Sequence, residues 1–437
     1  MIILYFVTFC VILPFASYQL QYSIYYRLLL PRNEKLMAEA KQTRIKRANA
    51  TNEKRVHESL EFINSLKMKM KAVVSSHITR KKETELQKST EKRSRMIVKQ
   101  KKQLFVSVTV ITSSRKQVHG SYDPRYLTQV SSQLLKLMEL EEKQKTNTHD
   151  SVQYKLFLCN VDQKPLNHEE VNSLMELITT FASEKRFVLS SYSDLFEKEK
   201  EDYVFCLKKT LLFELSPGIR PDYVVLIEDD AYPSTNLFPV LTYILHSHME
   251  TRNRANFITK NKESIAYVKL YHPRRLQSFI SLEPDRLPEL LGISMLFGTL
   301  LTGLYAYIKP KIYFSISKGS VNLCFVLFVI YSGMLAFCIG RQNIMAFRQL
   351  SKHLYAFVPA PHCCTPAMLF PSGNAWHLID KLAHVKCRAG YGKDTALFDI
   401  MRDSNMSAFM VSPSLFEHIG MYSMLRRGKL VDPDILP

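Results

Sequence analysis

Three consecutive carboxylates, Glu228-Asp229-Asp230, directly follow the apolar run DYVVLI at 222–227. Such a run predicts a buried strand, and ligands of parallel α/β sheets bind at the carboxyl ends of strands. Carboxylates gathered there repel one another and resist desolvation unless a cation lies close by. Oxygen ligands of this type suit Mn²⁺ or Mg²⁺, which usually also hold the phosphates of a substrate. The alternative is a solvated acidic turn.

Other common cofactor chemistries lack their motifs. The sequence contains neither GxGxxG nor GxxxxGK[ST], which excludes the Rossmann dinucleotide and P-loop classes. The 437 residues are 46% hydrophobic, which excludes global disorder, and only 13 are glycine, which excludes collagen-like repeats.

The elements that must position the carboxylates alternate along the chain. Apolar and β-branched runs predict strands, and helical spacing predicts the segments between them. Strands are expected at 104–112, 154–159, 187–190 and 222–227, and helices at 126–140, 167–183 and 201–215. This alternation predicts a parallel α/β sheet.

Three apolar segments predict membrane spans. Residues 1–17 are almost wholly apolar, and we expect them to begin an uncleaved anchor at 1–26, although a cleaved signal peptide is the alternative. Residues 287–308 and 321–340 are each long enough to cross a bilayer and form a hairpin at 287–340. The short basic loop between them, Lys309-Pro310-Lys311, predicts a cytoplasmic turn. Both flanks of the hairpin are then expected in the lumen.

The formal charge of +19 is concentrated in one stretch. Residues 32–103 hold 21 Lys and Arg against 8 Asp and Glu. We interpret 27–102 as a solvated basic helical stalk, with attraction to anionic lipid as the alternative and no nucleic-acid partner. The stretch would favour the cytosol, but the sequons Asn49-Ala50-Thr51 and Asn405-Met406-Ser407 favour the lumen. Five cysteines outside the apolar segments could form disulfides there, without a connectivity that can be read: Cys159, Cys206, Cys363, Cys364 and Cys387.

The carboxylate run and its surroundings resemble the metal-binding signature of GT-A glycosyltransferases. Together with the inserted hairpin, the chain resembles the family of GPI-glycan N-acetylgalactosamine transferases (post-GPI attachment to proteins factor 4). The stretches that carry this resemblance are LFVSVTVIT, DYVVLIEDDA, YVKLYHPRRLQSF, the hairpin, YGKDTALFD and PSLFEHIGMYS. PSLFEHIG also resembles branching N-acetylglucosaminyltransferases, which lack the hairpin.

The resemblance implies a role for each of several side chains. Residues near the nucleotide would be Val110, Ile111, Thr112 and Arg115. Glu228, Asp229 and Asp230 would together carry the metal and the donor ribose, with Asp230 as the direct metal ligand and Glu228 and His418 as further ligands. An inverting transfer needs one general base, and Asp394 would supply it, with Asp399 in reserve. Because Asp394 opens a predicted helix, helix capping is its alternative role.

The resemblance also implies substrates and location. It predicts a GT-A-like domain at 103–286 and 341–437, the second part facing the acceptor, with the hairpin between them. The enzyme would move GalNAc from UDP-GalNAc to a mannose of the GPI-anchor glycan in the Golgi lumen, with inversion and a divalent metal. The alternatives are an N-acetylglucosaminyl- or galactosyltransferase acting on N-glycans, or a non-catalytic three-pass membrane adaptor. His272 with Arg274 and Arg275 would contact phosphate, glycan or lipid headgroups, and Trp376 would lie in the core or stack on an acceptor sugar.

Overall fold

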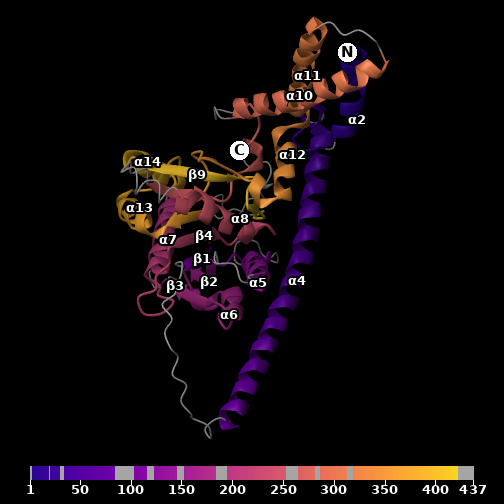
Figure 1. The fold of residues 1–437 in the computed structure, drawn as a ribbon. Helices are drawn as coiled ribbons and strands as arrows, with labels where there is room; N and C mark the ends of the chain where they lie inside the picture. The colour runs from indigo at the N-terminus through magenta and orange to yellow at the C-terminus, as the bar shows by residue number, and fades with distance from the viewer. Residues whose placement is uncertain are drawn as a thin grey trace, which may run out of the picture. The chain divides into compact units, whose positions relative to one another are not determined.

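The computed structural model describes residues 2–18, 20–29, 34–83, 103–115, 123–144, 152–183, 194–251, 264–280, 286–312 and 318–421 (Figure 1). The chain divides into two compact units. One comprises 1–46, 272–355 and 434–437, and the other comprises 47–271 and 356–433. The expected strand at 187–190 and the basic residues at 84–102 lie outside the described residues.

An 8-stranded mixed sheet forms the centre of the second unit. The strand order is β3 (Thr179–Ala182), β2 (Val152–Asn160), β1 (Leu104–Thr112), β4 (Tyr223–Glu228), β8 (Ala367–Pro371), β6 (Ile265–Lys269), β9 (Ser407–Ser412) and β7 (Ala356–Pro359). The first four strands are parallel, as predicted. From β8 the sheet becomes mixed, because β8 runs antiparallel to both β4 and β6, and β7 runs antiparallel to β9. The prediction of a wholly parallel sheet is therefore correct for one half only.

Helices cover both faces of this sheet. On one side α7 (Asp194–Leu212), α13 (Ser372–His384) and α14 (Lys393–Asp403) enclose the main apolar core with β1, β4, β6 and β8. On the other side α5 (Tyr126–Gln144) packs against β1, β2 and α8 (Leu237–Ile244). Helix α8 continues as a π-helix, η4 (Leu245–Glu250). A disulfide joins Cys159 at the end of β2 to Cys206 in α7, and a second joins Cys363 to Cys364.

The segment at 167–183 differs from its predicted helix. It begins with a 3-10 turn, η3 (Pro165–Asn167), and a short helix, α6 (Glu169–Leu174). The remainder forms β3, which adds to the free edge of β2. Pairing with an existing strand edge satisfies the backbone there, so tertiary context overrides the helical pattern.

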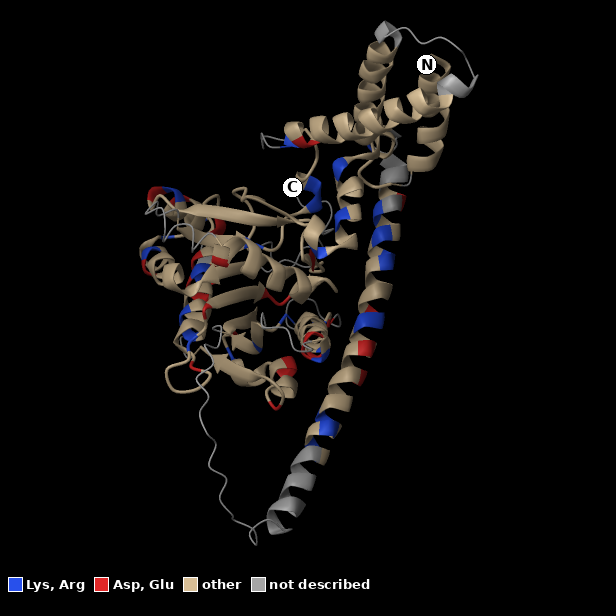
Figure 2. Ribbon diagram, in the orientation of Figure 1, with Lys and Arg blue, Asp and Glu red and all other residues tan. Residues whose placement is uncertain are grey.

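The other unit holds the helical hairpin. Helices α10 (Arg286–Ile312) and α11 (Lys318–Ile339) contain segments of 23 and 19 residues that are long and apolar enough to cross a membrane. In Figure 2 both are drawn almost wholly in the colour of uncharged residues. At Gly298 an added Cβ would lie 2.8 Å from Val329 Cα, so the glycine allows the two helices to approach closely. Arg341, just after α11, pairs with Glu289 of α10 at 2.6 Å.

The N-terminal apolar segment is helical and contacts the hairpin. It comprises α1 (Ile2–Phe6), a π-helix η1 (Val7–Ile12) and α2 (Leu13–Ser17), which is shorter than the two hairpin segments. Thr8 Oγ1 lies 3.0 Å from Tyr331 Oη on α11. The short elements of this unit are α3 (Ile24–Leu29), η5 (Arg274–Leu276), α12 (Arg341–Met345), η6 (Ala346–Leu350) and η7 (Lys352–Leu354).

The basic stretch forms one long helix, α4 (Glu34–Glu83), along which Lys and Arg recur (Figure 2). From residue 47 onward this helix belongs to the unit that contains the sheet. Asn52, Ser59 and Ile63 are buried there, on one face of the helix. The prediction of a helix is confirmed over these residues, but the interpretation as a solvated stalk is wrong for this part.

Candidate active site

The three carboxylates lie at the end of β4, as their position in the sequence predicts. Strand β4 is enclosed by β1 and β8, and Val224–Ile227 are fully buried. Glu228 ends the strand, and Asp229 and Asp230 form the turn into β5 (Ala231–Pro233). Both aspartates are buried, so the alternative of a solvated acidic turn is wrong.

A two-stranded ribbon brings His418 to this turn. Strand β10 (Phe416–His418) pairs antiparallel with β5, and His418 lies opposite Ala231. The backbone N–H of Ile419 donates to the carbonyl of Asp230 at 2.8 Å. The ribbon thereby places His418 Nε2 at 3.5 Å from Asp230 Oδ2. An added Cβ at Gly420 would overlap Asp230 Oδ2, so the chain needs glycine at this close approach.

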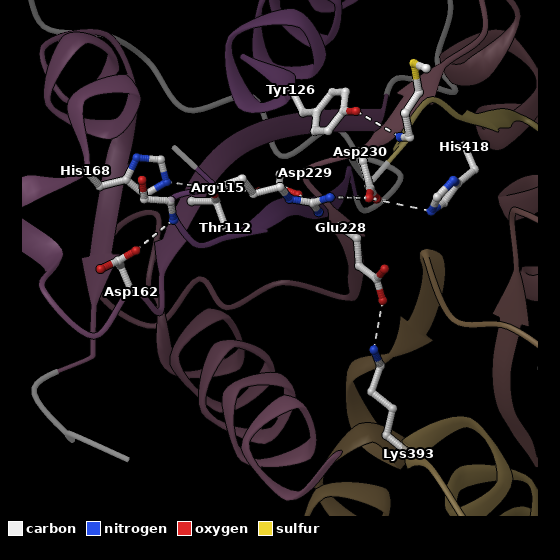
Figure 3. Close-up of polar contacts among 12 residues, drawn as sticks. Thr112, Arg115, Tyr126, Asp162, His168, Glu228, Asp229, Asp230, Lys393 and His418 are labelled. Atoms are coloured by element: carbon white, nitrogen blue, oxygen red, sulfur yellow. Dashed lines mark hydrogen bonds and ion pairs between the residues drawn. The ribbon is translucent and has the colours of Figure 1, made fainter. Parts of the chain in front are cut away.

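Arg115 neutralises the two aspartates. Its guanidinium donates to Asp229 Oδ1 at 2.5 Å and lies 2.9 Å from Asp230 Oδ2 (Figure 3). The same guanidinium lies over the ring of Tyr126 on α5 at 5.2 Å. Burial alone would lower the pKa of Arg115, but Asp229 and Asp230 raise it, so the guanidinium stays charged.

The two aspartates titrate differently because their surroundings differ. Burial raises the pKa of Asp229 to about 6, although Arg115 opposes this shift. Burial also acts to raise the pKa of Asp230, but Arg115 and His418 together hold it below its ordinary value. Asp230 is therefore the more firmly ionised carboxylate of the pair.

Asp230 and His418 retain capacity for a ligand. Asp230 Oδ1 and His418 Nδ1 are buried and have no hydrogen-bond partner among the described residues. A carboxylate oxygen and an imidazole are acceptable ligands for Mn²⁺, so these side chains fit the ion that the sequence analysis implies. No group of three or more His, Cys, Asp or Glu side chains in the described ranges is arranged to hold an ion. The remaining ligands would have to be water and substrate phosphate, as is usual for Mg²⁺ sites.

Glu228 points to a different partner. Its Oε1 accepts from Lys393 Nζ at 2.8 Å, and Lys393 also pairs with Glu199 of α7. In Figure 3 the Glu228 side chain extends toward Lys393, while Asp230 faces His418. Burial alone would lower the pKa of Lys393, but the two glutamates raise it. Glu228 thus belongs to an ion cluster around the buried Lys393 rather than to the Asp230–His418 pair.

Of the four residues predicted to flank a nucleotide, two contact the aspartates and two lie in the sheet. Thr112 Oγ1 donates to Asp229 Oδ2 at 2.9 Å, so Thr112 and Arg115 both reach the acids. Val110 is fully buried in the sheet, and Ile111 packs against the core beneath α7.

A pocket beside Asp229 contains side chains that the sequence analysis missed. Its lining includes Arg115, Tyr126, His168 and Glu170. His168 Nε2 lies 3.0 Å from Thr112 Oγ1, and burial lowers the pKa of this imidazole. Nearby, Asp162 Oδ2 accepts from the Ser114 N–H at 2.7 Å. Asp162 follows the carboxyl end of β2, which could have identified it, since β2 neighbours β1.

Asp394 lies in the first turn of α14, next to Lys393. Gly392 occupies the N-cap position, but the Asp394 carboxylate also bonds an N–H of the first turn, so both of its predicted roles stay predictions. One carboxylate oxygen accepts from the Thr395 N–H at 2.9 Å and the other from the Cys364 N–H at 3.5 Å. Asp399, further along the helix, accepts from the Tyr391 hydroxyl at 3.0 Å and pairs with Arg402. The Lys393–Glu228 contact ties the start of this helix to the end of β4.

Two further candidates are placed by the structure. Trp376 on α13 is 38% exposed, so the interpretation as a core residue is wrong, and stacking on an acceptor sugar stays a prediction. His272, Arg274 and Arg275 belong to the unit that holds the hairpin, and their substrate role also stays a prediction.

Comparison with known protein families gives one match. A family model described as GPI-N-acetylgalactosamine transferase PGAP4 matches residues 106–417, which is more than half of the chain. The matched range begins in β1 and ends in β10, so it includes Arg115, the three carboxylates, the hairpin and Asp394.

Proposed function

Because the chain belongs to the GPI-N-acetylgalactosamine transferase PGAP4 family, we propose that it transfers GalNAc from UDP-GalNAc to a mannose of the GPI-anchor glycan. The family consists of glycosyltransferases, so the chain is an enzyme, and the non-catalytic adaptor is set aside. The observation that carries the proposal is the buried cluster of Arg115, Asp229, Asp230 and His418 at the end of β4.

The donor would lie along the carboxyl ends of β1, β2 and β4. The pocket lined by Tyr126, His168 and Glu170 offers an aromatic ring and hydrogen-bonding groups to a nucleoside. Arg115, which lines that pocket and pairs with Asp230, would contact the diphosphate. Asp230 and His418 would hold Mn²⁺ or Mg²⁺, which when bound would supply positive charge to the departing diphosphate.

We assign the general base to Asp394. In an inverting transfer the acceptor oxygen forms a bond to C1 of the sugar while the C1–O bond to UDP breaks. The hydroxyl proton passes to Asp394, and UDP leaves with the electron pair. The N–H groups of Cys364 and Thr395 orient the carboxylate. Asp394→Asn keeps the shape of the side chain and one oxygen that can accept a hydrogen bond, but it cannot take up a proton. It should therefore lower kcat by about 10²–10⁴-fold without weakening UDP binding.

UDP release measures the donor choice directly. The full-length protein in detergent receives a GPI-glycan acceptor with UDP-GalNAc, UDP-GlcNAc or UDP-Gal, each with Mn²⁺ or with a chelator. We expect turnover of UDP-GalNAc that the chelator abolishes, and a β-linked product by NMR. Preference for another sugar, an α-linked product or full activity with the chelator would each contradict the corresponding part of the proposal.

We also propose a Golgi membrane location with the catalytic unit in the lumen. Support comes from the two apolar helices, the disulfides and one sequon. Asn405 is exposed in the turn between α14 and β9, where glycan attachment is sterically free, whereas Asn49 lies within α4. Protein from cells should lose mass on N-glycosidase treatment, and Asn405→Gln but not Asn49→Gln should remove that shift. No shift in the wild type would argue against lumenal placement.

A further inference from the structure

Helix α4 contributes directly to the packing of the unit that contains the sheet. On α4, Asn52 Oδ1 accepts from Gln129 Nε2 of α5 at 2.6 Å, and both side chains are buried. Gln129 also donates to the carbonyl of Pro124 at 2.8 Å, and Pro124 lines the pocket beside Asp229. Farther along α4, the Phe62 ring lies 5.0 Å from Lys136 Nζ of α5. The helix is therefore fixed against α5 over several turns.

One residue of α4 reaches the ribbon that carries His418. Arg55 Nη2 lies 3.3 Å from Glu417 Oε2, and its guanidinium lies 4.4 Å over the ring of Tyr232. Glu417 and Tyr232 are opposite each other in the β5–β10 ribbon. The next opposite pair is His418 and Ala231, and Ala231 follows Asp230 directly. Arg55 thus contacts both strands one residue pair away from the candidate metal ligand.

The ribbon is short, with three residues in each strand. Its inner side is held by the rest of the unit: the Leu415 N–H donates to the carbonyl of Leu270 at 2.8 Å, and Met421 N donates to the Tyr126 hydroxyl at 2.9 Å. On its outer side, Arg55 is the cation that contacts both strands. A cation that stacks on one strand and pairs with the other restricts their separation.

We propose that Arg55 is a positioning residue that holds the β5–β10 ribbon so that His418 faces Asp230, and that residues 47–72 of α4 form a wall that packs against α5 and this ribbon. The inference rests on the proposed function for the role of His418, but the packing itself does not. An enzyme fragment that begins at β1 would lack this wall.

A matched pair of variants in the full-length protein tests the inference. Arg55→Ala removes the contact with the ribbon, while Lys67→Ala removes another ion pair of α4, with Glu176 at 3.4 Å. The two basic side chains are equally exposed, at 24%, and their partners are 60% and 65% exposed. Both substitutions should therefore have similar small effects on Tm.

We expect Arg55→Ala to differ from Lys67→Ala in two measurements. Hydrogen exchange of a peptide covering 414–421 should speed up about 3–10-fold, because the ribbon opens more often. The Mn²⁺ concentration that half-saturates UDP binding should rise by a similar factor, measured by calorimetry and not by turnover. Arg55→Lys keeps the charge but not the planar stacking group, so it should restore part of both values. In a His418→Ala background, Arg55→Ala should add little further loss of Mn²⁺ affinity, because both changes remove one interaction.

Equal exchange and equal Mn²⁺ affinity in Arg55→Ala and Lys67→Ala would overturn the inference. Should Arg55→Ala fail to fold, Glu417→Gln removes the ion pair from the ribbon side, and the same exchange measurement decides. If the wild type shows no Mn²⁺-dependent UDP binding, the proposed metal role fails, yet faster exchange in Arg55→Ala would still establish that Arg55 holds the ribbon.

Discussion

Two charge clusters meet at the end of β4, and they are built on neighbouring residues. Each has one basic side chain between two acids. Arg115 joins Asp229 and Asp230, while Lys393 joins Glu228 and Glu199. Asp230 keeps a buried oxygen with no hydrogen-bond partner among the described residues, and an imidazole lies beside it. The first cluster can therefore bind a ligand, and we call it the open cluster. The second is neutralised by groups of the protein itself, and we call it the closed cluster.

The comparison shows how charge can serve function in one place and architecture in the next. Lys393 lies in the first turn of α14, where the helix dipole disfavours a cation. The two glutamates compensate for that position and so connect α7, β4 and α14. A run of three acids is thus not one site, because its members face different cations.

The same chemical change at neighbouring positions gives the sharpest test. Asp230→Asn should lower UDP release by about 10²–10³-fold or more, because it removes the ionised ligand of the open cluster. Glu228→Gln should leave the Mn²⁺ concentration required for half-maximal activity within about twofold, since Glu228 contacts Lys393. Equal losses of Mn²⁺ dependence would instead make Glu228 a metal ligand, as the sequence analysis expects.

Loss of Lys393 should act mainly on stability. Lys393→Met leaves Glu199 and Glu228 without their cation, and because both glutamates are partly exposed we expect the free energy of unfolding to fall by about 2 kcal/mol. Chemical denaturation measures this value. The control, Lys143→Met, breaks an exposed pair with Glu139 and should cost below about 1 kcal/mol. A cost for Lys393→Met as small as the control's would show that the closed cluster contributes no structural support.

Loss of Arg115 should weaken donor binding. Hydrogen bonds to charged groups contribute about 1.5–3 kcal/mol, so Arg115→Met should raise the Kd for UDP by about 10–100-fold. The variant should also gain more in Tm from added Mn²⁺ than the wild type does, because its two aspartates lack a cation. Lys393→Met should show no such extra gain. An unchanged Kd for UDP in Arg115→Met, or an equal gain in Tm from Mn²⁺ in both variants, would contradict the distinction between open and closed clusters.

Glu170, in the pocket beside Asp229, should give the smallest effect. Burial raises its pKa from 4.5 to about 7, although Thr128 donates to it twice. The folded state therefore holds the proton more tightly, and stability falls as the pH rises from about 4.5 to 7. Glu170→Gln does not have this pH-dependent loss. The free energy of unfolding of the variant, relative to the wild type, should therefore rise by about 1–2 kcal/mol between about pH 4.5 and 7, and Tm measured across that range should follow it. The exposed neighbour Glu169→Gln is the control, and a pH-independent difference for Glu170→Gln would disprove the shift.

Local patterns in the sequence predicted the elements that build the first half of the sheet. The run LFVSVTVIT matches β1, and the runs before Asn160 and Glu228 match β2 and β4 to within two residues. Helix α5 and the hairpin were also predicted, because apolar periodicity and length are local properties, whereas the helix expected at 201–215 covers only the second part of α7. The antiparallel insertion of β8 could not be predicted, because β8 follows the hairpin and its neighbours β4 and β6 precede it in the chain.

The sequence alone determined that three acids follow a buried strand, since an apolar run of that length must be enclosed and its end must reach the edge of the sheet. Only the tertiary structure decided which acid meets which cation. Glu228 is the last residue of β4 and faces α14, whereas the chain turns at Asp229 and Asp230, so Asp230 faces the ribbon. Their partners, Arg115, Lys393 and His418, come from distant parts of the chain, and only the packing of the sheet and its helices brings them together.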